Sequence, residues 1–193
     1  LSRRIDPGTT NIIDIYLLTQ AYYNAYQNYI RDTTGTVKEP AQPTIEELNT
    51  AYSTLDQYKM ISDNIILNSL TFKPLFGTKA ATELRATLKC VKNVNSTVST
   101  SEIKSQVINA INTYFTIDNW DFGDTFYFSE LSSYLHDQLG SIISTVVLVP
   151  TNPLKSFGDL YEIRSQSNEI FVNAATVNDV EVIDALTSSQ LRT

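Results

Sequence analysis

Four carboxylates lie between residues 116 and 130, and two large aromatic side chains lie among the first three of them. The carboxylates belong to Asp118, Asp121, Asp124 and Glu130, and the aromatic side chains to Trp120 and Phe122. Carboxylates in one loop can cage a cation, and a pair of them can serve as the acid and base of a glycosidase. The spacing does not fit an EF-hand, which needs acids at alternate positions, then a glycine and a distant glutamate.

We interpret this segment as a structural joint between two helices. Asp118 and Asp121 are expected to cap or solvate a turn, because short acidic side chains readily accept hydrogen bonds from nearby backbone amides. Trp120 and Phe122 are expected to fill the core. The main chemical alternative is a carbohydrate-active enzyme that uses the carboxylates of residues 118–130.

Other short segments match catalytic motifs, but the sequence lacks the further motifs that accompany them in known enzymes. Asp121-Phe122-Gly123 matches the metal-binding tripeptide of kinases, but the chain has neither their Gly-rich loop nor their catalytic loop. Gly77-Thr78-Lys79 lacks the upstream glycine of a P-loop. His136, the sole histidine, is expected at the surface or packed beside a leucine stripe, with no nucleophile-elbow motif to supply a serine. We therefore predict no enzyme, no catalytic residue, no cofactor-binding residue and no metal ligand.

Composition narrows the classes of partner. The net charge of −7 and the pI of about 4.6 disfavour nucleic-acid binding, which needs a basic face. No apolar run approaches the ~20 residues of a membrane span, so no membrane partner is expected. Charged residues make up 18% of the chain, below the ~25% of average domains, and a surface poor in charge and rich in Tyr suits lasting protein contacts. Cys90 stands alone and is predicted to be a small buried strand residue.

The first half of the chain has the pattern β-α-α-β. Alternating apolar residues predict a strand over 11–18, and Thr19 can cap a helix that runs to about residue 31. Thr44 and Glu47 have the spacing of a capping box, which predicts the start of a second helix. Strand-like composition returns over residues 60–76.

A stripe of Tyr22, Tyr26 and Tyr29 lies on one face of the first predicted helix. Such a stripe could stack sugars or bases, as aromatic platforms do. We favour a place in the helix core or in a protein interface. A glycan- or receptor-binding module that uses exposed tyrosines is the alternative.

The second half repeats the same order more clearly. A strand is predicted over 82–91, and Ser99 and Glu102 form a possible capping box for the helix that follows. The helix after the acidic connector is expected to turn four residues inward: Phe128, Leu131, Leu135 and Leu139. Gly140 is expected to end it in the C′ role, and the final strand, 145–149, stops at Pro150.

The tail is predicted to form β-hairpins. Residues 160–164 and 170–173 flank a turn over 165–168, and residues 177–183 can add a third strand. We therefore predict an α+β fold with two packed β-α-α-β subdomains and a C-terminal β-hairpin tail. The expected domains are 1–76, 77–150 and 151–193, with the tail packing on the second subdomain.

Several segments together carry a family likeness. In the second half a strand leads to a capped helix ending in Tyr114-Phe115, then to Gly123-Asp124-Thr125-Phe126-Tyr127 with Ser129 and Leu131, a second helix and an apolar strand to Pro150. This order resembles the C-terminal region of baseplate-J-type proteins of contractile tails. The segments 4–7, 10–19, 156–163 and 169–171 are similar to those of baseplate wedge proteins of T-even-type phages and their cyanophage relatives.

The resemblance implies a structural virion protein of the tail baseplate, assembled in the host cytoplasm, of which this chain is the C-terminal part. The absence of an initiator Met also suggests an excised domain of a larger protein. Members of the family self-associate, as a homodimer or ring, to join wedges around the tail hub, and other wedge proteins dock on them. The resemblance brings no catalytic residue, metal or cofactor. Residues 77–150 would be the baseplate-J-like subdomain.

Overall fold

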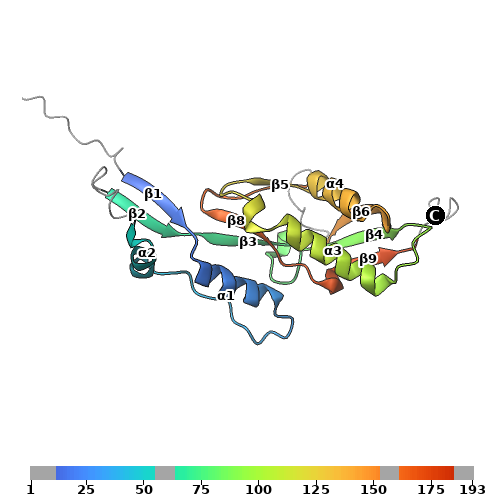
Figure 1. The fold of residues 1–193 in the computed structure, drawn as a ribbon, viewed down its shortest axis with the longest axis horizontal. Helices are drawn as coiled ribbons and strands as arrows, with labels where there is room; N and C mark the ends of the chain where they lie inside the picture. Colours follow the sequence, from blue (N-terminus) through green and yellow to red (C-terminus); the bar gives the residue numbers. More distant parts are fainter. Residues whose placement is uncertain (1–11, 55–63, 153–160, 185–193) are drawn as a thin grey trace, which may run out of the picture. The chain divides into compact units, whose positions relative to one another are not determined.

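The computed structural model describes residues 12–54, 64–152 and 161–184. The chain divides into two compact units, Leu1–Thr71 and Phe72–Thr193. The described residues of both units contain helices, with one two-stranded sheet in the first unit and several small sheets in the second, so the α+β prediction is confirmed (Figure 1). Within the described residues, no helix has the length and apolar character needed to cross a membrane.

The first unit contains the predicted order of elements: β1 (Ile12–Leu17), α1 (Gln20–Arg31), α2 (Ile45–Ala51) and β2 (Asn64–Ser69). β1 and β2 pair in parallel and lie side by side in Figure 1. Both predicted helix starts are confirmed. The Thr19 hydroxyl accepts a hydrogen bond from the amide of Tyr22 at 3.2 Å. Thr44 and Glu47 form the full capping box.

The tyrosine stripe of α1 belongs to the core of the first unit. Tyr22 and Tyr26 are buried, together with Ile30 and Leu48. Burial, with the nearby negative charge of Glu39, raises the pKa of Tyr26 well above its ordinary value. The core interpretation is therefore confirmed for these two tyrosines, and they offer no exposed platform for a sugar or a base.

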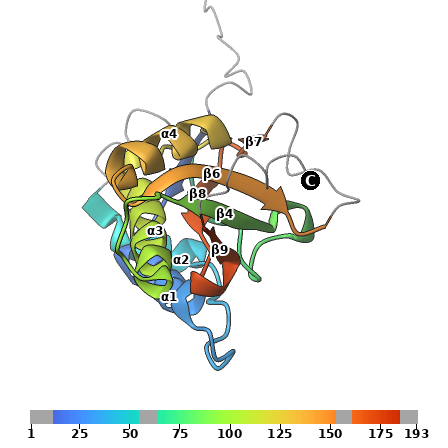
Figure 2. The same ribbon diagram turned by 90° about the vertical axis from the view of Figure 1, so that its right-hand side faces the viewer.

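The second unit is built on a three-stranded sheet in the order β6-β4-β9. β4 (Ala86–Lys92) pairs with β6 (Ile143–Pro150) antiparallel and with β9 (Val180–Ile183) in parallel. The helices α3 (Thr100–Tyr114) and α4 (Phe128–Leu139) lie between β4 and β6 in the chain, as predicted, but a short strand that was not predicted, β5 (Thr125–Tyr127), separates the two helices. Figure 2 shows both helices on the same side of the sheet.

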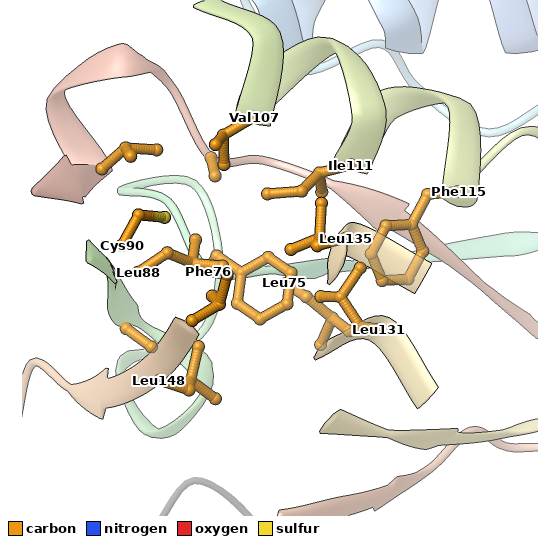
Figure 3. Packing of buried hydrophobic residues seen from close by; sticks show 14 of the residues in the cluster. Leu75, Phe76, Leu88, Cys90, Val107, Ile111, Phe115, Leu131, Leu135 and Leu148 are labelled. Carbon is orange, nitrogen blue, oxygen red and sulfur yellow. The ribbon is translucent and has the colours of Figure 1, made fainter. Parts of the chain in front are cut away.

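The core of the second unit lies between this sheet and the two helices. Within each helix the buried residues are four positions apart, because the apolar stripes face the sheet. The stripes consist of Ile103, Val107 and Ile111 in α3 and of Leu131, Leu135 and Leu139 in α4. Phe76 and Leu88 pack among them (Figure 3). The predicted buried position of Cys90 is confirmed, and burial raises the pKa of its thiol to about 12.

The predicted C-terminal hairpin is wrong. β7 (Glu162–Arg164) pairs with β5 (Thr125–Tyr127), whereas β8 (Glu169–Asn173) lies beside β3 (Thr71–Leu75). A turn does separate β7 from β8, with the amide of Glu169 donating to the carbonyl of Gln166 at 2.9 Å. However, the last four residues of β8 are all buried, so this strand needs cover on both faces, which a solvated hairpin does not provide.

Three local predictions also change. The strand predicted from residue 82 begins at Ala86, after a 3-10 turn over Thr82–Leu84. The strand-like segment 60–76 contains two strands, β2 and β3, and its residues 60–63 lie outside the described part of the chain. At Ser99 half of the capping box forms, since its hydroxyl accepts from the amide of Glu102 at 3.3 Å while the Glu102 carboxylate accepts from Gln106.

Gly140 ends α4, but not in the predicted left-handed C′ conformation. Its φ of −60° is right-handed, which any residue can adopt. A Cβ at this position would lie 2.6 Å from the carbonyl oxygen of His136. Glycine is therefore favoured at the end of α4 by close backbone approach, not by a positive φ.

Candidate functional site

The connector between α3 and α4 is fixed by hydrogen bonds to the end of α3. The indole nitrogen of Trp120 donates to the carbonyl of Tyr114 at 2.9 Å, and the side-chain amide of Asn119 donates to the carbonyl of Thr113 at 3.0 Å. The last carbonyls of a helix have no partner within the helix. The connector therefore supplies the donors that the C-terminal end of α3 needs.

Asp124 organises the turn in the middle of the connector. Its carboxylate accepts a hydrogen bond of 2.7 Å from the amide of Asp121, and Gly123 adopts a left-handed φ of 78° inside this turn. Asp118 and Asp121 have exposed side chains, as residues of a solvated turn. The carboxylate that holds the backbone thus belongs to Asp124, whereas the sequence pointed to Asp118 and Asp121.

The two aromatic residues of the connector have different environments. Trp120 stacks on Phe115, with ring centres 5.3 Å apart and planes 13° from parallel, and meets the ring of Phe171 edge-on at 5.2 Å. Its predicted packing against the core is confirmed. The prediction for Phe122 is wrong, because its side chain is 41% exposed. The hydrogen bond between Asp121 and Asp124 closes a tight turn that places Phe122 at its tip, away from the core.

A pocket of about 480 Å³ opens where the connector meets the ends of the two helices. Its lining comprises Tyr114, Asn119, Trp120, Asp124, Thr125, Glu130 and Tyr134. We call it the aromatic–acidic pocket. Its tyrosine rings lie 5.3 Å apart, centre to centre, and both are half-buried. Burial, with the nearby charge of Glu130, raises the pKa of Tyr114 to about 12, so its hydroxyl keeps its proton at neutral pH.

The four acids are close together in the sequence, but they do not all lie at the same site in the structure. Asp124 and Glu130 line the pocket, whereas Asp118 and Asp121 do not. Within residues 12–54, 64–152 and 161–184, no three acidic, histidine or cysteine side chains stand close enough to hold a metal ion. Chemically, the pocket offers aromatic rings and two carboxylates to a ligand that enters from solvent.

Sequence reasoning missed the tyrosines of this pocket. Glu130 and Tyr134 are four residues apart on α4, so they share one helix face, and this spacing was a usable signal. Tyr114 comes from the end of α3, and its place beside Tyr134 depends on how the two helices pack. That packing is a non-local feature that the local pattern does not contain.

His136 lines a second pocket, of about 300 Å³, with Asp137 and hydroxyl residues of α4 and β6. The histidine is exposed, which confirms a surface position. A serine hydrolase needs its nucleophile hydrogen-bonded to the base. In the described part of the chain, no hydrogen bond joins His136 to Ser132, Ser133 or Ser144. This arrangement is therefore a polar surface hollow without the contact that activates a serine.

Comparison with known proteins adds no family name. No protein-family model matches the chain, and no curated protein matches it. The likeness to baseplate-J-type and wedge proteins accordingly stays a sequence-based hypothesis.

Proposed function

We propose that this protein is a structural subunit of the baseplate wedge of a contractile tail, and that it acts by protein contact. The observation that carries the proposal is the construction of the connector. In the connector between α3 and α4, Trp120 donates a hydrogen bond to the C-terminal end of α3, and the Asp124 carboxylate fixes the turn of the connector. Both contacts stabilise the connection between the two helices, which is a structural role. The same residues belong to the stretch that resembles baseplate-J-type proteins.

The connector also ties distant parts of the second unit together. The backbone carbonyl of Asp124 accepts hydrogen bonds from the amide of Ser165 at 3.1 Å and from its hydroxyl at 2.7 Å. The amide of Gly123 donates to the carbonyl of Glu169 at 3.3 Å. A loop fixed by several backbone hydrogen bonds resists local opening, which suits a subunit that must stay folded in contact with neighbouring chains.

The sheet of the second unit supports a role in contacts with other chains. Among the described strands, β6 pairs with β4 alone, so its other edge presents backbone donors and acceptors. Val147 in this strand is 47% exposed. Edge strands with apolar side chains readily pair with another chain. We propose that copies of this protein and other wedge proteins cover such surfaces in the virion tail, after assembly in the host cytoplasm.

Light scattering over a range of protein concentrations tests this proposal. We expect a homodimer or a ring whose population rises with concentration, and co-elution with other wedge proteins when they are mixed. A chain that stays monomeric at every concentration and joins no wedge protein would contradict the proposal.

The second candidate function is glycan binding or hydrolysis, and the aromatic–acidic pocket is the observation that favours it. Aromatic rings stack on sugars, and two carboxylates are the catalytic set of most glycosidases. Hydrolysis of cell-wall glycans by the natural protein, lost in Glu130→Gln, would establish this function. Absence of hydrolysis by the natural protein would exclude the enzyme.

A further inference from the structure

The aromatic–acidic pocket combines half-buried rings with uncompensated negative charge. Its walls include the rings of Tyr114, Trp120 and Tyr134 and the carboxylates of Asp124 and Glu130. Among the described residues, no lysine or arginine belongs to its lining. Since the Tyr114 hydroxyl stays protonated, the acids are the charged groups of the site.

The basic side chains on the neighbouring strands are already paired with acids of their own. Arg164 in β7 lies 2.9 Å from Glu162, and the amine of Lys73 in β3 lies 3.0 Å from Glu169. Asp118, in the same connector, adds a further exposed carboxylate. The described residues around the pocket therefore contribute a net negative charge, which favours a cation from outside the chain.

We propose that this pocket binds the side chain of an arginine supplied by a partner protein. A guanidinium group is planar, so it stacks on aromatic rings while its N–H groups donate to carboxylates. The pocket offers both kinds of contact within one hollow. A neutral sugar would use the rings but would leave the negative charge unmatched. The source of the arginine, a neighbouring wedge subunit, rests on the proposed function, whereas the chemistry of the pocket does not.

The position of Trp120 gives a direct measurement. It is the sole tryptophan of the chain and lines the pocket, so its fluorescence reports binding there. We expect a saturable change on titration with N-acetylarginine amide and a much weaker one with N-acetylcitrulline amide, which has the same shape without the charge. Equal responses to both compounds would overturn the proposal. A saturable response to a chitin oligosaccharide with none to the arginine compound would also overturn it, in favour of glycan binding.

A charge-neutralising variant tests the role of the acids. Glu130 is exposed, so Glu130→Gln should leave the fold intact, and far-UV circular dichroism checks this. We expect it to weaken binding of N-acetylarginine amide about fivefold, the effect of losing one partly screened charge. Asp137→Asn removes the same charge from the same helix outside the pocket and should leave the affinity unchanged. Equal affinities for natural protein and Glu130→Gln would contradict the proposal.

Salt dependence gives an independent measurement. Attraction between a cation and partly exposed acids weakens as ions screen it, so affinity for N-acetylarginine amide should fall as the salt concentration rises. An affinity that does not change with salt would contradict a charge-based site. These titrations use the isolated chain, and assembly is measured by light scattering. A chain that binds the arginine compound but never assembles would contradict the proposed function while supporting the pocket, and the reverse result would do the opposite.

Discussion

The indole nitrogen of Trp120 lies 2.9 Å from the carbonyl oxygen of Tyr114, and the rings of these two residues are 5.6 Å apart. One side chain thereby closes the end of α3 and forms a wall of the aromatic–acidic pocket. The residue has a structural task and a binding task at once. Substitutions in the connector are therefore needed to measure the structural role and the binding role separately.

Trp120→Phe keeps an aromatic ring but removes the indole donor. The carbonyl of Tyr114 then loses the hydrogen bond of 2.9 Å at a partly buried position and keeps the longer one, of 3.5 Å, from the side-chain amide of Asn119. We expect a loss of about 1–2 kcal/mol in the free energy of unfolding, measured by urea denaturation. Phe122→Leu changes an exposed aromatic residue of the same connector and should alter stability by less than about 0.5 kcal/mol. Equal effects of the two substitutions would contradict the assigned role of Trp120.

Asp124→Asn and Asp121→Asn form a matched pair. The Asp124 carboxylate accepts the amide of Asp121, whereas the Asp121 side chain is exposed. Hydrogen bonds to charged groups contribute about 1.5–3 kcal/mol, and an asparagine keeps part of this through its carbonyl oxygen. We therefore expect Asp124→Asn to cost about 1 kcal/mol of unfolding free energy and Asp121→Asn almost nothing. A larger cost for Asp121→Asn would show that the turn is held differently.

The buried thiol of Cys90 predicts a loss of stability in alkaline solution. Its pKa is raised from 9.0 to about 12 in the folded protein. Above pH 9 the thiol ionises in the unfolded chain but keeps its proton in the folded one, so the folded state binds more protons. Stability is complete below pH 9 and falls as pH rises towards 12, by about 1.4 kcal/mol per pH unit for such a group.

Thermal unfolding between pH 8 and 11 measures this effect, because the decline begins near pH 9, the pKa of the thiol in the unfolded chain. Tyr114, whose pKa is raised from 10.0 to about 12, contributes in the same direction from pH 10 upward. In Cys90→Ala the decline between pH 9 and 10 should become shallower. In the natural protein, the thiol should react with a thiol reagent at pH 8 only after denaturant is added. Rapid labelling of the folded protein would contradict its burial.

Val147→Glu tests the edge strand β6 as a contact between chains. Val147 is exposed and lies opposite Lys89 of β4, which already pairs with Glu181 at 2.9 Å, so a glutamate at position 147 stays solvated beside a lysine and should leave the fold intact. A charge on an edge strand opposes pairing with another chain. We expect the variant to shift light-scattering masses towards the monomer. Val94→Glu, at an 80% exposed loop residue, is the control and should leave the masses unchanged. Identical masses for both variants and the natural protein would exclude this edge.

Local signals in the sequence predicted the local structure well. Thr19 and Thr44 cap the helices they were expected to cap, because a capping hydrogen bond involves residues only a few positions apart. The inward stripe of α4 follows from the period of the helix in the same way. The order of β4, α3, α4 and β6 in the second unit, which rests on these signals, was therefore predictable, whereas the three-residue strand β5 between the helices was missed.

Pairing between distant strands was not predictable from the same signals. Alternation over residues 160–173 indicates extended chain, but it does not say which strand will be the neighbour. The sequence therefore predicted a hairpin of β7 and β8, although β7 pairs with β5 and β8 pairs with β3. The candidate site follows the same rule. The acids of the connector could be identified from the sequence. The contact between Tyr114 and Tyr134 could not, because it depends on the packing of α3 on α4.

The parallel pairing of β4 with β9 has a consequence for synthesis. Leu88 lies beside Val180, so the central strand of the sheet receives one of its two neighbours from the far end of the unit. Contacts between residues so distant in sequence form late, because a long loop must close first. On the ribosome, the sheet of the second unit stays incomplete until residues 180–183 have emerged. Until then one edge of β4 presents unpaired backbone groups, and unpaired strand edges favour contact with other chains.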